Sequence, residues 1–183
     1  MVFIDDKHYI DLILQGHHAS YRFLVDRYKK MVFSICLRVL TNTEDAEDAA
    51  QESFLKAFKQ LDTFKGISKF STWLYTITYR ICVSRLKENS LETTEINNEL
   101  MENLPGAIQQ QPLDSLNAVE TAQFVKEAIN KLPRIDALII TLYYMDENSV
   151  REIVEITGLS ESNVKIKLFR ARKELEQSLR FLV

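Results

Sequence analysis

The stretch that decides the fold lies near the C-terminus, at residues 149–175, and reads SVREIVEITGLSESNVKIKLFRARKEL. Ser149 and Glu152 have the spacing of a capping box, in which the hydroxyl and the carboxylate each accept a hydrogen bond from a backbone amide at a helix start. Gly158 is expected to end that helix, because a left-handed backbone is cheap only for glycine. Ser160 then caps a second helix. The pattern predicts a helix-turn-helix with a three-residue turn.

The second helix, expected to reach about Leu179, has two chemically different faces. The inward positions are apolar: Val164, Leu168, Ala171 and Leu175. The outward positions mix polar, basic and apolar side chains: Ser162, Asn163, Lys165, Ile166, Phe169, Arg170 and Lys173. In helix-turn-helix motifs the start of this helix enters the major groove, where basic side chains reach guanine or phosphate and apolar ones contact thymine methyls. We predict that the outward residues bind DNA. A helical hairpin whose charges only keep it in solution is the alternative.

The rest of the chain also repeats its apolar residues at helical spacing. We expect helices at residues 8–15, 19–40, 43–61 and 71–87, with Thr43 as the cap of the third. Periodicity returns after Leu116, and Pro133 starts a further helix. No strand pattern of comparable length competes. The predicted fold class is all-α: two small helical domains, residues 1–88 and 120–183, joined by a flexible linker at residues 89–119.

Residues 89–119 differ from the rest of the chain in composition. They contain no lysine or arginine but hold five acids: Glu92, Glu95, Glu99, Glu102 and Asp114. Together with Pro105-Gly106 and a run of three glutamines, this composition is typical of a solvated tether. The whole chain carries a net charge of −3, so the part outside the tether is net positive. The distribution of charge is therefore compatible with DNA binding even though the total is negative.

The sequence offers no pattern for a metal, a cofactor or catalysis. Cys36 and Cys82 are the only cysteines, and each lies within an apolar helical pattern that is typical of a buried thiol. His8 stands alone, and His17 and His18 are adjacent, whereas zinc ligands on a helix usually sit four residues apart. No apolar run approaches the roughly 18 residues of a membrane span, and the N-terminus lacks the layout of a signal peptide. We expect a cytoplasmic protein that is not an enzyme and does not insert into a membrane.

Three segments of the first domain form a specific set. They read DAEDAAQESF at residues 45–54, FKGISKF at 64–70 and STWLYTI at 71–77. With the basic helix at residues 160–172, they resemble the extracytoplasmic-function (ECF) sigma factors of bacterial RNA polymerase. Motif order and spacing agree over both domains. The resemblance implies a first domain like sigma region 2, which binds core polymerase and the −10 element, and a second like region 4, whose helix-turn-helix binds the −35 element.

The resemblance also implies roles for individual residues. The acidic helix looks like the element that docks on the clamp helices of the largest polymerase subunit, with Asp48, Gln51 and Glu52 on its outer face. The following loop resembles one that captures a flipped non-template base, a task that suits aromatic walls and nearby cations. The residues implied in −10 binding are Phe64, Lys65, Ser68, Lys69, Phe70, Tyr75, Tyr79 and Arg80. Trp73 shares a stripe with Ile77 and Ile81, which favours core packing for its ring.

Two residues depart from the family pattern. The family often has asparagine at the position of Arg80, and a small polar residue where this chain has Ile166. An isoleucine facing the groove favours thymine methyls. Other implications concern partners: the family acts with core polymerase and promoter DNA, is monomeric when free, and is typically held inactive by an anti-sigma factor. The linker resembles the segment that threads near the polymerase active site, although a plain solvated linker has the same composition.

Three other interpretations of the sequence remain open at this point. A self-sufficient helix-turn-helix regulator would be a dimer that binds a palindrome without polymerase, but no coiled-coil heptads favour it. A small helical enzyme would need clustered catalytic side chains or a glycine-rich phosphate loop, and neither is present. A helical adaptor that binds only protein would leave Lys165, Phe169 and Arg170 without a role.

Overall fold

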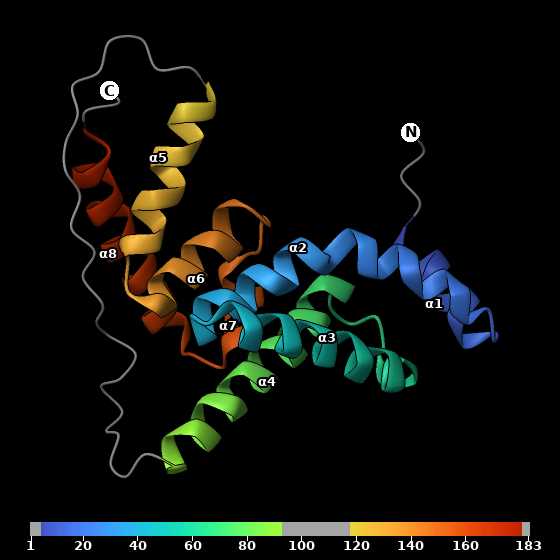
Figure 1. Ribbon diagram of the computed structural model, residues 1–183. Coiled ribbons are helices and arrows are strands. Elements are labelled where there is room, and N and C mark those ends of the chain that lie inside the picture. The colour runs from blue at the N-terminus through green and yellow to red at the C-terminus, as the bar shows by residue number, and fades with distance from the viewer. Residues whose placement is uncertain (1–4, 93–117, 181–183) are drawn as a thin grey trace.

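The computed structural model describes residues 5–92 and 118–180. Within these two segments the chain forms eight α-helices and two short 3₁₀ turns, with no strand (Figure 1). The helices are α1 (Asp6–Leu14), α2 (Tyr21–Leu40), α3 (Thr43–Lys59), α4 (Phe70–Glu92), α5 (Ala118–Lys131), α6 (Arg134–Tyr144), α7 (Val150–Thr157) and α8 (Glu161–Ser178). The predicted all-α class is confirmed.

The expected linker can be compared with the structure only at its edges. Helix α4 continues to Glu92 and α5 begins at Ala118, so the first four and the last two positions of residues 89–119 are helical. The remaining prediction, a flexible tether, concerns residues 93–117 and lies outside the described residues.

Helices α1 to α4 form the first domain, in which α2, α3 and α4 pack against one another. Buried residues of α2 recur at helical spacing, among them Leu24, Val32, Ile35 and Val39. The face of α3 that meets them carries small side chains, including Ala46, Ala49 and Ala57, which allow the helices to approach closely. Removing one aliphatic side chain of this kind from water contributes about 1.5–3 kcal/mol, so this seam is a main source of stability for the domain.

The start of α3 differs from the sequence prediction by one residue. Asn42, rather than Thr43, is the cap, because its side-chain oxygen accepts a hydrogen bond from the amide of Glu44 at 2.9 Å. Both residue types can cap a helix, and asparagine is the stronger of the two. The expected helix 19–40 also begins later, since His18–Ser20 forms a 3₁₀ turn ahead of α2.

Helices α5 to α8 form the second domain, and its helix-turn-helix is built as predicted. The Glu152 carboxylate accepts a hydrogen bond from the Ser149 amide at 2.7 Å, and the Ser149 hydroxyl accepts one from the Glu152 amide at 3.3 Å. Gly158 ends α7 with a left-handed φ of 72°. The Ser160 hydroxyl accepts a hydrogen bond from the Asn163 amide at 3.3 Å and so caps α8.

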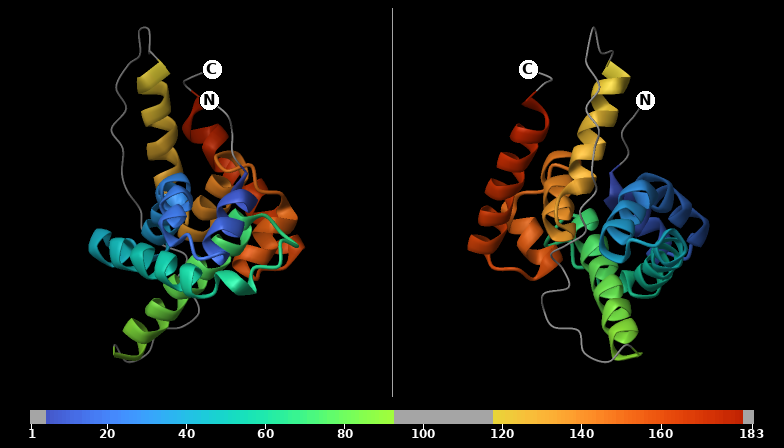
Figure 2. Two further views of the ribbon diagram at one scale, coloured as in Figure 1. Left: turned by 90° about the vertical axis from the view of Figure 1, so that its right-hand side faces the viewer. Right: turned by 60° about the vertical axis from the view of Figure 1, so that its left-hand side comes forward.

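The two domains lie against each other. Helix α4 packs on α7, and the C-terminal part of α2 lies beside α6 (Figures 1 and 2). A hydrogen bond from the Arg38 guanidinium to the Asn130 side chain, at 3.3 Å, joins α2 to α5. The packing of α4 on α7 joins two helices of different domains, and the local patterns of the sequence give no indication of it.

Candidate nucleic-acid interfaces

The outer face of α8 is open to solvent. All seven predicted −35 residues are exposed and lie on this one helix: Ser162, Asn163, Lys165, Ile166, Phe169, Arg170 and Lys173. Two of them are large apolar side chains, Ile166 at 50% exposure and Phe169 at 68%. Since Val164, Leu168 and Ala171 are buried on the opposite side, the helix presents a mixed basic and apolar surface to solvent.

Two other basic residues of α8 are held by their own domain. Arg172 donates a hydrogen bond to the Tyr144 hydroxyl at 2.7 Å, and its guanidinium lies over the Tyr143 ring, 5.3 Å from the ring centre. Lys167 pairs at 2.9 Å with Asp136, a buried residue near the start of α6. Both side chains are bonded to their own domain, Lys167 to a buried carboxylate and Arg172 to two tyrosines at the surface, and in this they differ from Arg170 and Lys173 although the charge is the same.

The loop between the 3₁₀ turn at Leu61–Thr63 and α4 is the second candidate surface. Gly66 takes a left-handed φ of 67°, and Ile67 after it is 90% exposed. Lys65 and Lys69 are also exposed, so the loop offers two cations around an apolar tip. Sequence reasoning did not single out Ile67, although an isoleucine at the tip of a polar loop is an unusual choice.

Aromatic rings form the floor of this loop. Phe64, Phe70 and Trp73 pack on one another with ring centres 5.5 to 5.7 Å apart. Phe64 and Trp73 are partly exposed, whereas Phe70 is 3% exposed. Trp73 packs against the core, as its helical spacing indicated. Phe70 is therefore not accessible to a base in this arrangement, and its assignment to the −10 element stays a prediction.

The same applies to two tyrosines of α4. Tyr75 is completely buried and Tyr79 is 8% exposed, whereas both were expected on an accessible face. The Tyr75 hydroxyl donates a hydrogen bond to Asp146 of the second domain at 3.2 Å, and burial raises the pKa of both tyrosines. Only Arg80 of the expected α4 contacts is exposed. The second domain covers the part of α4 that sequence reasoning assigned to DNA.

The loop itself is also bonded to the second domain. The Lys69 ammonium pairs with the Glu152 carboxylate at 3.0 Å, and the Ser68 hydroxyl donates to the Glu155 carboxylate at 3.1 Å. Nearly two turns along α4, the Thr76 hydroxyl donates to the Glu155 carbonyl oxygen at 3.4 Å. Glu152 and Glu155 were not assigned any role across domains from the sequence, because nothing local to α7 points to such a contact.

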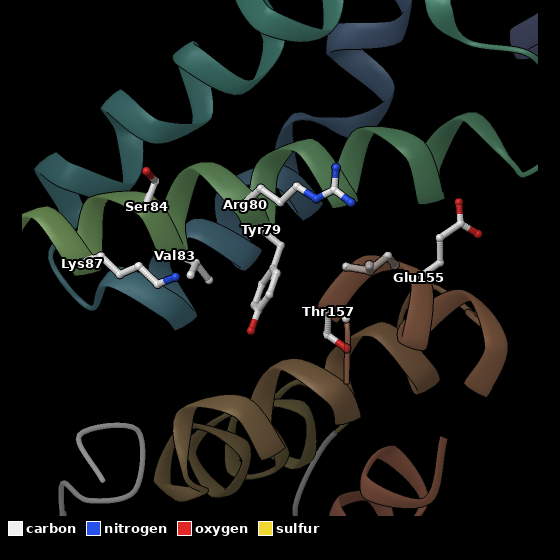
Figure 3. A pocket seen from close by; sticks show the side chains of 9 residues that line it. Tyr79, Arg80, Val83, Ser84, Lys87, Glu155 and Thr157 are labelled. Carbon is white, nitrogen blue, oxygen red and sulfur yellow. The ribbon is translucent and has the colours of Figure 1, made fainter. Parts of the chain in front are cut away.

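A cavity of about 390 Å³ separates α4 from the turn after α7. Tyr79, Arg80 and Lys87 line it from α4, while Glu155 and Thr157 line it from α7. Figure 3 shows the Tyr79 ring projecting from α4 into the space between the two domains. The two domains therefore meet tightly at the start of α4 and more loosely further along it.

Two carboxyl groups at the domain contact have shifted pKa values. Burial raises the pKa of Asp146, which accepts hydrogen bonds from Tyr75 and Asn148. Burial also acts to raise the pKa of Glu152, but the Ser149 amide and the Lys69 ammonium outweigh it, and the pKa falls below its ordinary value. Glu152 is therefore ionised at neutral pH and serves the α7 cap and Lys69 at once.

The acidic face of α3 is the third candidate surface. Asp48, Gln51 and Glu52 are all exposed there, and Glu52 pairs with Arg85 of α4 at 2.7 Å. Leu55, which is 62% exposed, follows at helical spacing on the same face. An exposed leucine beside three polar residues was missed at the sequence level and extends the face by one turn.

Neither a metal site nor a membrane span is found in the part of the chain that the structure describes. No group of three or more His, Cys, Asp or Glu side chains gathers there, and none of its helices is long and apolar enough to cross a bilayer.

Comparison with known proteins identifies the family. Residues 24–92 match Sigma-70 region 2, and residues 125–175 match Sigma-70, region 4. The chain is 32% identical over 182 residues to the ECF RNA polymerase sigma factor SigW of Bacillus subtilis, a match that spans 96% of this chain and 97% of SigW. The chain belongs to the ECF sigma factors of RNA polymerase. Sigma factors are transcription initiation factors, so this protein is not an enzyme.

Other relatives agree with this placement. This chain is also 29% identical over 187 residues to the ECF RNA polymerase sigma-E factor of Escherichia coli strain K12. The match covers 98% of this chain and 97% of the sigma-E factor. Its fold resembles the sigma factor RpoE of Bartonella quintana, solved with the anti-sigma factor NepR, with a TM-score of 0.64 and 22% identity over 87% of this chain and 96% of RpoE. It also resembles CnrH, solved with the cytosolic domain of CnrY, with a TM-score of 0.62 and 20% identity over 96% and 97% of the two chains.

Proposed function

We propose that this ECF sigma factor contacts its promoter and core polymerase through three separate surfaces. Exposed residues of α8 bind the −35 element, the loop before α4 binds the melted −10 element, and the outer face of α3 docks on the polymerase. The observation that carries the proposal is the exposed face of α8, where seven polar, basic and apolar side chains line the second helix of a capped helix-turn-helix. Such a helix fits the major groove of duplex DNA.

At the −35 element we assign Lys165, Arg170 and Lys173 to guanine edges or phosphates. Ile166 and Phe169 supply apolar area for thymine methyl groups. Ser162 and Asn163 lie in the first turn of α8, where a helix start meets the DNA backbone and its amides favour a phosphate. Because the basic residues contact phosphates as well as bases, binding should weaken steeply as the salt concentration rises.

At the −10 element we assign the accessible residues of the loop. Phe64 offers an aromatic edge to an unstacked base, and Lys65 and Lys69 neutralise phosphates of the separated strand. Ser68 of the loop and Arg80 of α4 add polar contacts. Base–aromatic stacking is worth roughly 1–3 kcal/mol per base, which helps to hold a strand out of the duplex.

On the polymerase side we assign Asp48, Gln51 and Glu52 to the clamp helices of the largest subunit. Each domain alone is expected to bind its DNA element weakly. Docking fixes the separation of the domains, so the second DNA contact becomes intramolecular and gains from a high effective concentration. We further propose that a cognate anti-sigma factor holds this protein inactive in the cytoplasm, as expected for the family.

The proposal is tested by run-off transcription with purified core polymerase on a promoter library. The wild-type chain should initiate at a subset of promoters that core polymerase alone does not use. Asp48→Arg should abolish binding to core polymerase, because it places a cation in the centre of the acidic face. Asp26→Arg, which changes an exposed acid on α2, is the matched control and should leave polymerase binding intact.

Different failures point to different alternatives. Tight dimeric binding to a palindrome by the chain alone, with no effect on polymerase, would indicate a self-sufficient regulator. Failure to bind core polymerase under any condition would contradict the sigma-factor proposal for these surfaces, whatever the DNA result.

A further inference from the structure

The residues assigned to the −10 element are bonded to the second domain of the same chain. Lys69 pairs with Glu152, Ser68 donates to Glu155, and nearly two turns along α4 Thr76 reaches the Glu155 backbone. These contacts join the loop and the start of α4 to one face of α7. The groups involved on the first domain are a cation and two hydroxyls, which are the kinds of group that bind nucleic-acid phosphates.

The partner groups on α7 have the chemistry of a phosphate. Glu152 and Glu155 present carboxylate oxygens, and one turn of α7 places them three residues apart. Glu155 is exposed and takes no part in the α7 cap, which Ser149 and Glu152 form, so its contact with Ser68 is not a by-product of that cap. A phosphate of the melted strand and the acidic edge of α7 would therefore occupy the same positions on the loop.

The packed arrangement also cannot span a promoter. Ser68 lies 3.1 Å from Glu155, and α8 begins at Glu161, six residues further along. Six residues reach at most about 20 Å, so the −10 loop lies close to the start of the −35 helix. The two promoter elements are about 25 base pairs apart, roughly 85 Å of duplex at 3.4 Å per step. Both surfaces can meet one promoter only after the domains separate.

We propose that the face of α7 carrying Glu152 and Glu155 is a binding surface for the −10 loop of the same chain, and that it competes there with promoter DNA. The proposal rests on the −10 role assigned to the loop. While the −10 loop is bound to α7 (the closed arrangement), the chain is inactive. Separating the domains costs free energy, and this cost weakens the affinity of the chain for a promoter. The acidic face of α3 stays exposed, so polymerase can dock before the domains separate.

A reversible cross-link tests this proposal on the full chain. In the double variant Ser68→Cys, Glu155→Cys, the two new thiols face each other across the domain contact. A short bis-maleimide with a cleavable centre joins them, each thiol adding across one maleimide double bond. The native thiols do not interfere, because Cys36 and Cys82 are both completely buried. The single variants carrying the same reagent control for its bulk.

Three results are expected if the proposal holds. The free double variant cross-links within the chain in high yield, and saturating core polymerase with promoter DNA lowers that yield. The cross-linked chain still binds core polymerase. Run-off transcription from a promoter that the wild-type chain uses falls by more than about tenfold, and cleavage of the reagent restores it to the level of the single variants.

Other results overturn the proposal without touching the assigned function. Absence of the cross-link in the free chain would mean that the domains do not pack this way, and full activity of the cross-linked chain would mean that the closed form is competent. If the wild-type chain itself fails to direct transcription, the assigned function fails instead. The two failures are therefore distinguished by the wild-type arm.

Discussion

The outer face of α8 and the outer face of α4 carry the two expected DNA surfaces, yet only one of them is open. On α8 every assigned residue is exposed, whereas on α4 the two tyrosines are buried and only Arg80 is exposed. The difference lies in what covers each helix. Helix α8 packs on its own domain with a single face, while α4 is packed by α2 and α3 on one side and by α7 on the other. A DNA-binding surface can thus be complete in sequence and masked in the folded chain.

The first and largest test compares two neighbouring residues of α8. Leu168→Ala removes a buried side chain and should destabilise the second domain by about 2–5 kcal/mol. Phe169→Ala removes an exposed ring and should change stability by less than about 0.5 kcal/mol while weakening binding to −35 duplex DNA. Chemical denaturation followed by circular dichroism, together with a DNA titration, checks both. Equal destabilisation by the two changes would mean that α8 has no open face.

A second test compares two arginines of the same helix. Arg170→Ala should cost about 1–3 kcal/mol in binding to −35 duplex DNA, because it removes a contact to a base or phosphate. Arg172→Ala should leave DNA affinity nearly unchanged, since its guanidinium is bonded to Tyr144 and stacked on Tyr143. Fluorescence anisotropy with a labelled duplex measures both affinities at one salt concentration. A larger loss of DNA affinity for Arg172→Ala than for Arg170→Ala would show that the side of α8 carrying Arg172, and not the side carrying Arg170, faces the DNA.

The third test concerns the capping box of α7, whose Glu152 carboxylate also pairs with Lys69 of the first domain. Ser149→Ala removes the cap of α7 and should cost about 1 kcal/mol. For a domain of this size that lowers the melting temperature by roughly 4–8 °C, measurable by calorimetry. Ser160→Ala, at the cap of α8, is the matched change. It should destabilise the domain similarly but leave the Lys69–Glu152 contact intact, so only Ser149→Ala should also increase the exposure of α4.

The smallest expected effect is at the ion pair itself. Lys69 is 60% exposed in this pair, and a surface ion pair contributes only about 0–1 kcal/mol. Lys69→Gln should therefore open the domains only slightly, and adding salt to the wild-type chain should have a similar effect. The cross-linking yield between positions 68 and 155 reports on both. A complete loss of packing in Lys69→Gln would mean that the rest of the contact between α4 and α7 contributes almost nothing.

Much of the fold follows from local sequence. The capping box at Ser149, the left-handed Gly158 and the cap at Ser160 depend on neighbouring residues, and all three are confirmed. The exposed face of α8 follows from one apolar stripe, because a helix with a single stripe has a single buried side. The cap of α3 was assigned to Thr43 instead of Asn42 since both residue types cap helices and only geometry separates them.

The masking of α4 could not be predicted in this way. From Ser71 to Tyr79 nearly every residue is buried, and several are hydroxyl-bearing side chains that an amphipathic pattern assigns to solvent. Thr76 and Thr78 donate to carbonyl oxygens of their own helix, so their burial does not depend on a partner elsewhere, although Thr76 also reaches the Glu155 carbonyl. The remaining signal, a helix apolar on both sides, indicates that a second surface covers it but does not say which one.

The contrast between the two surfaces is tested most directly by hydroxyl-radical footprinting of the native chain, read by mass spectrometry. In the free protein we predict rapid modification of Phe169 and Ile166 and strong protection of Tyr79, which faces the second domain. Binding of core polymerase together with promoter DNA should increase the modification of Tyr79. If Tyr79 reacts in the free chain as fast as Phe169, the domains are separate in solution and the account of a masked −10 surface is wrong.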